Sequence, residues 1–302
     1  MSVHAQASGK TGQEASHKPV SSLDILRCKG KRRIAVLTAY DYSQACIVDA
    51  AGMDVVLVGD SLGMVMLGLD DTMGVTLEDM ISHTRSVVRG ISHALVVADM
   101  PFMTYETGIA DALRNAHRLC VESGVRAVKL EGGRTVAPQV KALVDAGIPV
   151  MGHIGLTPQR AAVLGGFKVQ GKTASAAADL LRDALALQDA GCFSIVVEAV
   201  PADLATKLSQ RLTIPTIGIG AGVGCDGQVL VYHDLLGLYG RFVPKFVKQY
   251  ASLAPVIQDA IAAYAAEVKA ETFPAPEHSF AMPEKETALL DELFDAVLRE
   301  KR

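Results

Sequence analysis

Four short apolar runs in this sequence each end on a carboxylate side chain. The run "VVLVGD" ends at Asp60, "LVVAD" at Asp99, "AVKLE" at Glu131 and "SIVVE" at Glu198. One such acid is readily explained as a solvated loop residue or a helix N-cap, because aspartate is favoured where a helix begins. Four runs that end in the same way favour a second explanation, in which the carboxylates converge on one site.

Converging carboxylates predict a bound cation. Like charges in a shared site disfavour one another's ionised forms, and a cation removes that conflict. Oxygen ligands with no cysteine among them are those that Mg²⁺ and similar hard ions prefer. We therefore expect one Mg²⁺ ion where these runs end.

Two basic side chains accompany the acids. Lys129 stands two residues before Glu131, so the alternation of a strand directs both side chains to the same face. A lysine inside an apolar strand must find an anion or lose its charge. We expect a substrate carboxylate as that anion, and a structural Lys–Asp pair inside the fold is the alternative. His153, which ends the run "PVMGH", is expected to contact a polar substrate, or else to have a structural role.

The acids are positioned by a repeated βα unit. From about Arg33 onward, a short apolar run, a turn and an amphipathic stretch recur in that order. Glycines that follow helices and precede strands mark the repeat, as expected for left-handed C-terminal caps: Gly52, Gly124, Gly147 and Gly191. One helix, over residues 76–89, opens with a capping box of Thr76 and Asp79. Strands are expected at residues 34–38, 55–59, 95–98, 127–130, 149–152, 194–197, 215–218 and 229–232.

Eight such strands predict an α/β fold of the (β/α)8 TIM-barrel type rather than an open doubly wound sheet. Continuous apolar strands separated by helices are typical of parallel strands buried on both faces. In a barrel, the carboxyl ends of all strands meet at one face. The side chains expected around that face are Asp60, Asp99, Glu131, His153 and Glu198.

A glycine-rich segment, "GIGAGVG", follows the seventh expected strand. Its glycines do not fit the G-x-G-x-x-G spacing of dinucleotide-binding folds. Two interpretations stay open, a loop that binds an anionic group and a loop whose glycines allow close packing of the backbone.

Composition narrows the class of protein. The chain has 302 residues, half of them apolar, and can bury a large core. A net charge of −4 without a basic stripe argues against nucleic acid as a partner. Five cysteines without a CxxC pair fit reduced thiols, and neither a signal peptide nor a bilayer-spanning run is recognisable, so we expect a cytoplasmic protein without membrane contact.

The two ends of the sequence differ from its middle. Residues 1–20 are polar and are expected to be disordered. After a proline-rich link, apolar residues form one helical stripe: Leu289, Leu290, Leu293, Phe294, Val297 and Leu298. We therefore expect a disordered segment at 1–20, a barrel domain at 21–280 and an amphipathic helix at 281–302. That helix should pack on the same barrel or on a neighbouring subunit.

Eight motifs give the sequence a family resemblance. They are "TAYDYSQA" (38–45), "LVGDSLGM" (57–64), "ADMPFM" (98–103), "VKLEGG" (128–133), "GHIGLTPQ" (152–159), "GGFKVQGK" (165–172), "GIGAG" (218–222) and "VPKF" (243–246). In this order they resemble the ketopantoate hydroxymethyltransferase family, over residues 21 to 280.

The resemblance implies a (β/α)8 barrel of the phosphoenolpyruvate/pyruvate-binding type that assembles as a homo-oligomer, commonly a decamer. It implies transfer of a one-carbon unit from 5,10-methylenetetrahydrofolate to 3-methyl-2-oxobutanoate, which gives 2-dehydropantoate in pantothenate biosynthesis. By the same resemblance the metal ligands fall on Asp60, Asp99 and Glu131, and the general base on Glu198. The oxo-acid contacts fall on Asp60, Ser61, Asp99 and Lys129.

These assignments suggest a mechanism. An oxo acid that chelates Mg²⁺ is easier to enolise, because the metal stabilises charge on the keto oxygen as C3 loses a proton. Glu198 would take that proton. Lys129 and Ser61 would hold the substrate carboxylate so that the enolate faces the one-carbon donor.

Three other functions remain compatible with the pattern. A lyase of the isocitrate-lyase or phosphoenolpyruvate-mutase type would share the fold and the acids, but the cysteine-containing K-[KR]-C-G-H-like loop of those enzymes is absent from this sequence. An aldolase could use Lys129 as a Schiff-base nucleophile. A non-catalytic barrel would bind the oxo acid without exchanging its C3 proton.

Overall fold

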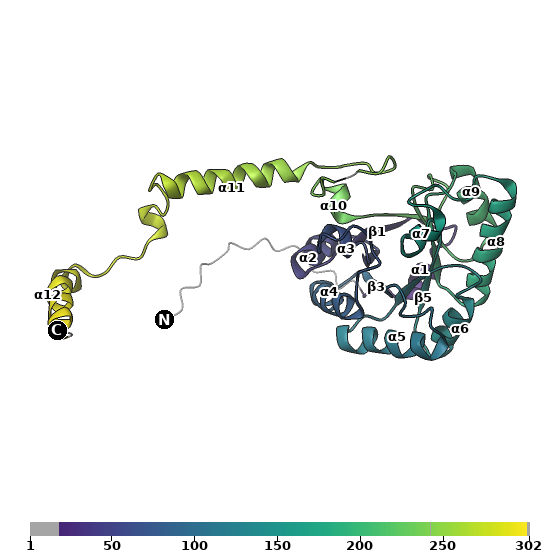
Figure 1. Ribbon diagram of the computed structural model, residues 1–302, viewed down its shortest axis with the longest axis horizontal. Coiled ribbons are helices and arrows are strands. Elements are labelled where there is room, and N and C mark those ends of the chain that lie inside the picture. Colours follow the sequence, from purple (N-terminus) through teal and green to yellow (C-terminus); the bar gives the residue numbers. More distant parts are fainter. Residues whose placement is uncertain (1–17, 242, 301–302) are drawn as a thin grey trace. The chain divides into compact units, whose positions relative to one another are not determined.

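A computed structural model describes residues 18–241 and 243–300 of the chain. Contacts divide the chain into two compact units, of which the first ends at Tyr250 and the second begins at Ala251. The first unit contains a closed barrel of eight parallel strands surrounded by helices (Figure 1). The predicted (β/α)8 barrel is confirmed.

Each strand of the barrel pairs with the next strand in the sequence. The eight strands are β1 (Ile34–Thr38), β2 (Val55–Val58), β3 (Leu95–Asp99), β4 (Val128–Glu131), β5 (Val150–Gly155), β6 (Ser194–Glu198), β7 (Thr216–Ile219) and β8 (Gly227–Leu230). Val36 of β1 lies opposite both Val55 of β2 and Val229 of β8, which closes the ring. Every predicted strand overlaps an observed one, but β5 continues past its predicted end, so that His153 lies within it.

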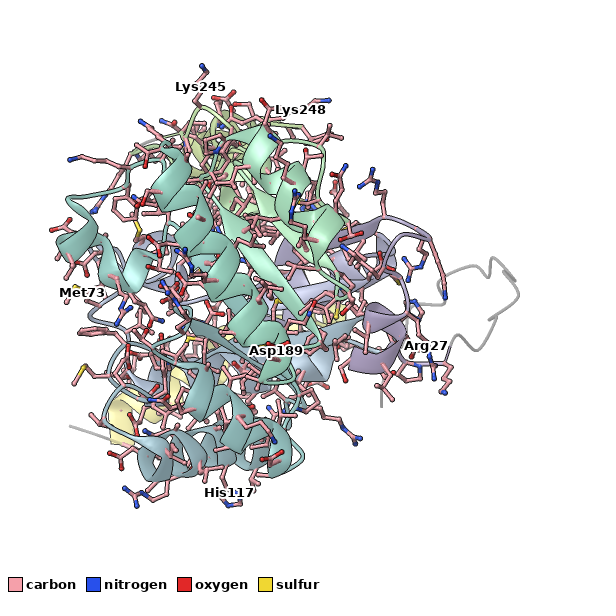
Figure 2. All side chains as sticks on the ribbon, turned by 90° about the vertical axis from the view of Figure 1, so that its right-hand side faces the viewer. Arg27, Met73, His117, Asp189, Lys245 and Lys248 are labelled. Carbon is pink, nitrogen blue, oxygen red and sulfur yellow. The ribbon has the colours of Figure 1, made fainter. Side chains whose placement is uncertain are left out.

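Helices separate the strands, as the repeat predicted, except that β7 is followed directly by β8. Within the first unit they are α1 (Ser22–Leu26), α2 (Tyr42–Ala50), α3 (Leu62–Val65), α4 (Leu77–Gly90), α5 (Ile109–Ser123), α6 (Ala137–Asp145), η1 (Pro158–Arg160), α7 (Ala161–Leu164), α8 (Ala174–Asp189), α9 (Ala202–Arg211) and α10 (Tyr232–Leu235). Figure 1 shows α5, α6, α8 and α9 on the outside of the barrel. Exposed polar side chains cover this outer layer, and Figure 2 labels Arg27 and His117 at its periphery.

The local signals in the sequence are present in the structure. The Thr76 hydroxyl accepts a hydrogen bond from the Asp79 N–H, and the Asp79 carboxylate accepts one from the Thr76 N–H, which completes the predicted capping box of α4. The four predicted cap glycines, from Gly52 to Gly191, have φ values from 80° to 99°. In the "GIGAGVG" segment, a Cβ on Gly220 would lie 2.7 Å from the Phe246 ring. This contact supports a packing role for that glycine.

The barrel interior is apolar toward the amino ends of the strands and charged toward their carboxyl ends. Val55, Leu57, Val97, Met151 and Ile217 belong to a buried cluster, and Ile25 of α1 packs into the same cluster. Alternate residues of a strand face the same side, so Asp99 and His153, two positions after Val97 and Met151, point into the barrel nearer the carboxyl ends of the strands.

The second unit contains α11 (Leu253–Lys269), η2 (Pro276–His278) and α12 (Glu284–Glu300). A helix occupies most of residues 281–302, and its apolar stripe is exposed. The division between units falls at residue 250, whereas the sequence grouped residues 21–280 as one domain; the difference is α11, which carries no buried side chain. Most of the segment expected to be disordered, 1–20, lies outside the described residues. In the described part of the chain, no helix has the length and hydropathy that a membrane span requires.

Candidate active site

Charged side chains gather where the strands end. Asp99, Lys129, Glu131 and His153 are each 2–4% exposed, and Asp60, two residues after β2, is equally buried. We call these five residues the strand-end cluster. Parallel registry brings its members together, since Asp99 lies opposite Lys129, and Glu131 lies opposite His153.

Lys129 is the cation at the centre of this cluster. Its Nζ atom lies 2.9 Å from Asp99 Oδ1 and 3.9 Å from Glu131 Oε1. Burial opposes the charge on Lys129, but Asp99, Glu131 and Asp60 together raise the pKa of its ammonium group. Lys129 is therefore held protonated, which argues against a Schiff-base aldolase, because a lysine nucleophile must be neutral.

Asp60 and Ser61 form the turn after β2. The Asp60 N–H donates to Asp99 Oδ2 at 3.0 Å, so the two neighbouring strand ends are tied together. The Ser61 hydroxyl lies 2.9 Å from the hydroxyl of Tyr40, which is fully buried at the end of β1. The turn thus presents a carboxylate and a hydroxyl whose positions are both fixed by neighbours.

His153 connects the cluster to Glu198, the last residue of β6. Its Nδ1 atom lies 3.3 Å from Glu131 Oε1 and its Nε2 atom 3.1 Å from Glu198 Oε2. Burial and the charge of Lys129 oppose protonation of His153, but the carboxylates of Glu131 and Glu198 raise its pKa to about 9. The protonated imidazole is therefore an ion-pair partner that lies between Glu131 and Glu198.

The carboxylates of the cluster outnumber their cations. Burial first, and then the charges of Asp99 and Glu131, raise the pKa of Asp60 well above its ordinary value. Burial also raises the pKa of Asp99, although Lys129 opposes the shift. The pKa of Glu131 is lowered despite its burial, because His153 and Lys129 stabilise the carboxylate. Of the three carboxylates, Asp60 is therefore the one whose ionised form is least stabilised by the cations of the cluster.

The strand-end cluster offers oxygen ligands of the kind that Mg²⁺ binds. Its three carboxylates are the hard oxygen donors that this ion prefers, and burial together with the charges of Asp99 and Glu131 raises the pKa of Asp60. Among the residues that the structure describes, no three acidic, histidine or cysteine side chains are arranged as a complete metal-binding group. Magnesium commonly uses only one or two carboxylates and keeps water or substrate as its other ligands. The donor set fits a magnesium ion held in that way.

The structure places all seven residues expected from the sequence at the carboxyl ends of the barrel: Asp60, Ser61, Asp99, Lys129, Glu131, His153 and Glu198. It also brings in two residues that the sequence did not indicate. Gln159, in η1, and Tyr105, after β3, are buried and hydrogen-bonded to the cluster. The only signal for Gln159 was its place in the "GHIGLTPQ" motif; for Tyr105 the sequence held no signal.

The fold defines a class of barrel that is known from solved structures. Phosphonopyruvate hydrolase in complex with oxalate and Mg²⁺ matches with a TM-score of 0.55 at 11% identity, over 92% of this chain and 98% of that one. A 2,3-dimethylmalate lyase, a member of the phosphoenolpyruvate mutase/isocitrate lyase superfamily, matches with a TM-score of 0.53 at 16% identity, over 94% and 100% of the two chains. At these identities the likeness shows the shared fold.

Sequence comparison then shows the family. The model of the ketopantoate hydroxymethyltransferase family matches residues 20–276. The 3-methyl-2-oxobutanoate hydroxymethyltransferase of Nitratidesulfovibrio vulgaris is 63% identical over 283 residues, which cover 93% of this chain and 92% of that protein. The chain belongs to the ketopantoate hydroxymethyltransferase family. The family predicted from the eight motifs is confirmed, and with it the prediction of a transferase.

Proposed function

We propose that the chain transfers a hydroxymethyl group from 5,10-methylenetetrahydrofolate to 3-methyl-2-oxobutanoate and so forms 2-dehydropantoate. The observation that carries the proposal is the strand-end cluster, found in a chain 63% identical to an enzyme named for this reaction. The methylene group of the folate carries no oxygen, whereas the product carries a hydroxymethyl group. The overall reaction therefore consumes one water, breaks the carbon–nitrogen bonds of the donor and forms one bond to C3 of the oxo acid.

Lys129 and Ser61 are proposed to bind the carboxylate of the oxo acid. Lys129 is buried, charged and held by Asp99, so its ammonium group needs little reorganisation to accept an anion. The Ser61 hydroxyl is placed by Tyr40 at the neighbouring strand end. A homologous barrel that binds oxalate together with Mg²⁺ supports a 2-oxo acid here, because both ligands present two adjacent oxygens.

Asp60, Asp99 and Glu131 are proposed to hold Mg²⁺, one or two of them directly and the rest through water. The shortage of positive charge at Asp60 supports this assignment. When bound, the ion would supply positive charge where the keto oxygen of the substrate becomes negative.

Glu198 is proposed to remove the C3 proton. Its side chain is 15% exposed, more than the acids of the cluster, and one of its oxygens is held by His153. This arrangement orients the carboxylate and leaves its second oxygen to face a substrate. His153 would then act on the substrate through Glu198, besides the polar substrate contact predicted from the sequence.

The experiment that tests these roles is proton exchange. The protein is incubated with 3-methyl-2-oxobutanoate in deuterium oxide, with Mg²⁺ or with a chelator, and loss of the C3 proton is followed by NMR. We expect exchange that needs the metal and falls by about 10²–10⁴-fold in Glu198→Gln, since a general base contributes that much. Glu122→Gln, on the surface of α5, is the matched control and should exchange at the wild-type rate.

Any of three results would contradict the proposal. Exchange at the wild-type rate in Glu198→Gln would remove the base from its role. Full turnover in the presence of a strong chelator would remove the metal. A barrel that binds the oxo acid but never exchanges its C3 proton would be a binding protein rather than this transferase.

Assembly and location are part of the same proposal. We infer a cytoplasmic homo-oligomer, commonly a decamer in this family, without a nucleic-acid or membrane partner. The exposed apolar stripe of α12, in which Phe294 is 60% exposed and Leu298 64%, supports an interface between subunits. The five cysteines are all free, which supports a reducing compartment. Light scattering of the full chain and of a chain ending at Phe280 would test the assembly, because the particle mass gives the number of subunits. The same number of subunits in both would contradict a role for α12.

A further inference from the structure

Gln159 is a buried amide in contact with two acids of the cluster. It follows β5 in η1, and 2% of its surface is exposed. Its backbone N–H donates to Glu131 Oε2 at 3.0 Å, and its Nε2 atom donates to Asp60 Oδ2 at 2.9 Å. One residue from a loop therefore connects carboxylates that come from β4 and from the end of β2.

The orientation of this amide is determined by its neighbours. Nε2 also donates to the Met100 carbonyl at 3.0 Å, so both of its hydrogens are used. Oε1 accepts from the Tyr105 hydroxyl at 2.6 Å. If the amide were turned over, Oε1 would face a carboxylate and a carbonyl, and no hydrogen would stand between them.

Tyr105 extends this connection to the backbone of β4. Its hydroxyl oxygen accepts from the Glu131 N–H at 3.2 Å, and its one hydrogen is directed to Gln159 at the shorter distance. Hydrogen bonds therefore run from the Glu131 N–H through Tyr105 and Gln159 to Asp60. The bond from the Gln159 N–H to the Glu131 carboxylate closes the circuit, and hydrogen bonds in such a circuit strengthen one another.

We propose that Gln159, oriented by Tyr105, is a positioning residue that holds Asp60 and Glu131 in place for the divalent cation. This inference rests on the proposed function, because it assigns a role toward the metal. Gln159 occupies Oδ2 of Asp60, whereas Oδ1 accepts no hydrogen bond from the residues that the structure describes. The amide thus selects Oδ1 as the oxygen that faces the cation.

The test uses Gln159→Met, which keeps the length of the side chain and removes its donors and acceptor. The backbone bond to Glu131 is retained in this variant. The probe is Mn²⁺ alone, a hard ion with the same ligand preference as Mg²⁺, and its binding is followed by loss of the free-ion electron paramagnetic resonance signal. We expect the dissociation constant to rise about tenfold or more, the effect usual for residues that orient metal ligands.

The matched control is Gln188→Met at the far end of α8. The Gln188 Oε1 atom accepts from the Thr213 N–H at 2.7 Å and the Thr213 hydroxyl at 3.0 Å, so the control also removes hydrogen bonds of a partly buried amide. We expect it to lower thermal stability without changing the affinity for Mn²⁺. A role of Gln159 that was only structural would give the same result in both variants.

A second variant keeps the inference testable if Gln159→Met does not fold. Tyr105→Phe removes the hydroxyl that orients the amide and should weaken Mn²⁺ binding in the same direction. In the double variant, the dissociation constant for Mn²⁺ should rise by less than the product of the two single fold-increases, because Tyr105 acts through Gln159.

The outcomes separate the two proposals. If the wild-type protein binds no Mn²⁺, the metal in the proposed function is wrong, and the role of Gln159 toward it falls as well. If the wild type binds Mn²⁺ and the Gln159→Met and Tyr105→Phe variants bind it equally well, only the positioning role is overturned. Independent effects of the two substitutions would show that Tyr105 does not act through Gln159.

Discussion

Both ends of the barrel pair a lysine with an aspartate, but the Lys129 side chain is 4% exposed and that of Lys29 is 20% exposed. At the carboxyl ends of the strands, Lys129 Nζ lies 2.9 Å from Asp99. At the amino ends, Lys29 Nζ lies 2.8 Å from Asp226, just before β8. The distances are nearly equal, so the two pairs differ in their burial and in the groups around them.

At the amino ends, one carboxylate has several donors. Asp226 Oδ2 accepts from Lys29, from the Ser209 hydroxyl at 3.0 Å and from the Thr216 N–H at 2.9 Å. Burial raises the pKa of Asp226, but these donors outweigh it and the pKa is lowered. Charge and hydrogen bonds are balanced there, as expected for a group that stabilises the fold.

At the carboxyl ends, three carboxylates share the available cations. The pKa of Asp60 is raised and that of Lys129 is raised as well, which are the two signs of an excess of negative charge. Barrels of this type place their active sites at the carboxyl ends and their stabilising contacts at the amino ends. The end of the barrel with unbalanced charge is therefore the one prepared for a ligand.

Among the variants that compare the two lysine–aspartate pairs, the largest effect is expected from Lys129→Met. The variant removes the charge that is proposed to bind the substrate carboxylate and should slow C3 exchange by about 10²–10³-fold, as loss of a preorganised electrostatic group does. Lys29→Met is the matched control at the amino ends and should exchange at the wild-type rate while it is folded. NMR exchange rates at equal folded protein check the prediction, and similar losses in both variants would contradict the difference between the ends.

A smaller effect, on stability alone, is expected from Asp226→Asn. The variant leaves Lys29 without its counter-charge and weakens the bonds to Ser209 and Thr216. The free energy of unfolding should fall by about 2 kcal/mol, typical of a buried polar group that loses part of its partners. Urea unfolding measures the change, and C3 exchange by the folded variant should match the wild type. A loss of exchange without a loss of stability would place function at the amino ends too.

The sequence predicted the acids of the site because the end of a strand can be recognised where an apolar run stops. Apolar runs of regular length located Asp99, Glu131 and Glu198, and the alternation of a strand placed Lys129 beside them. The fold followed from the same regularity, since eight runs with glycine-capped helices between them leave few architectures.

Other features could not be read from the sequence because they depend on loops and on long-range contacts. Gln159 reaches Asp60 across 99 positions of sequence, and Tyr105 reaches Gln159 across 54. No period marks such residues, and a polar side chain in a loop is ordinarily exposed. The stabilising role of Asp226 could not be predicted either, because its partners Lys29 and Ser209 lie in separate segments that only the closed barrel brings together.

The smallest effect is expected from Asp60→Asn in protein kept free of divalent ions. The pKa of Asp60 in the folded protein is raised above the ordinary value of 3.8, so the folded state binds a proton more tightly than the unfolded chain. The stability of the metal-free wild type should therefore decrease as the pH rises above 3.8, until the raised pKa is passed.

Asparagine does not ionise, so the Asp60→Asn variant should lack that decrease. It should be more stable than the wild type at neutral pH by about 0.5–1 kcal/mol, as when a residue kept for function is replaced. Asp226, whose pKa is lowered, predicts the opposite dependence, a contribution that is lost as the pH falls below 3.8. Urea unfolding in a chelator at several pH values would show both slopes. A variant less stable than the wild type at neutral pH would mean that the carboxylates of the strand-end cluster are already balanced without a metal ion, and the contrast between the two ends of the barrel would be lost.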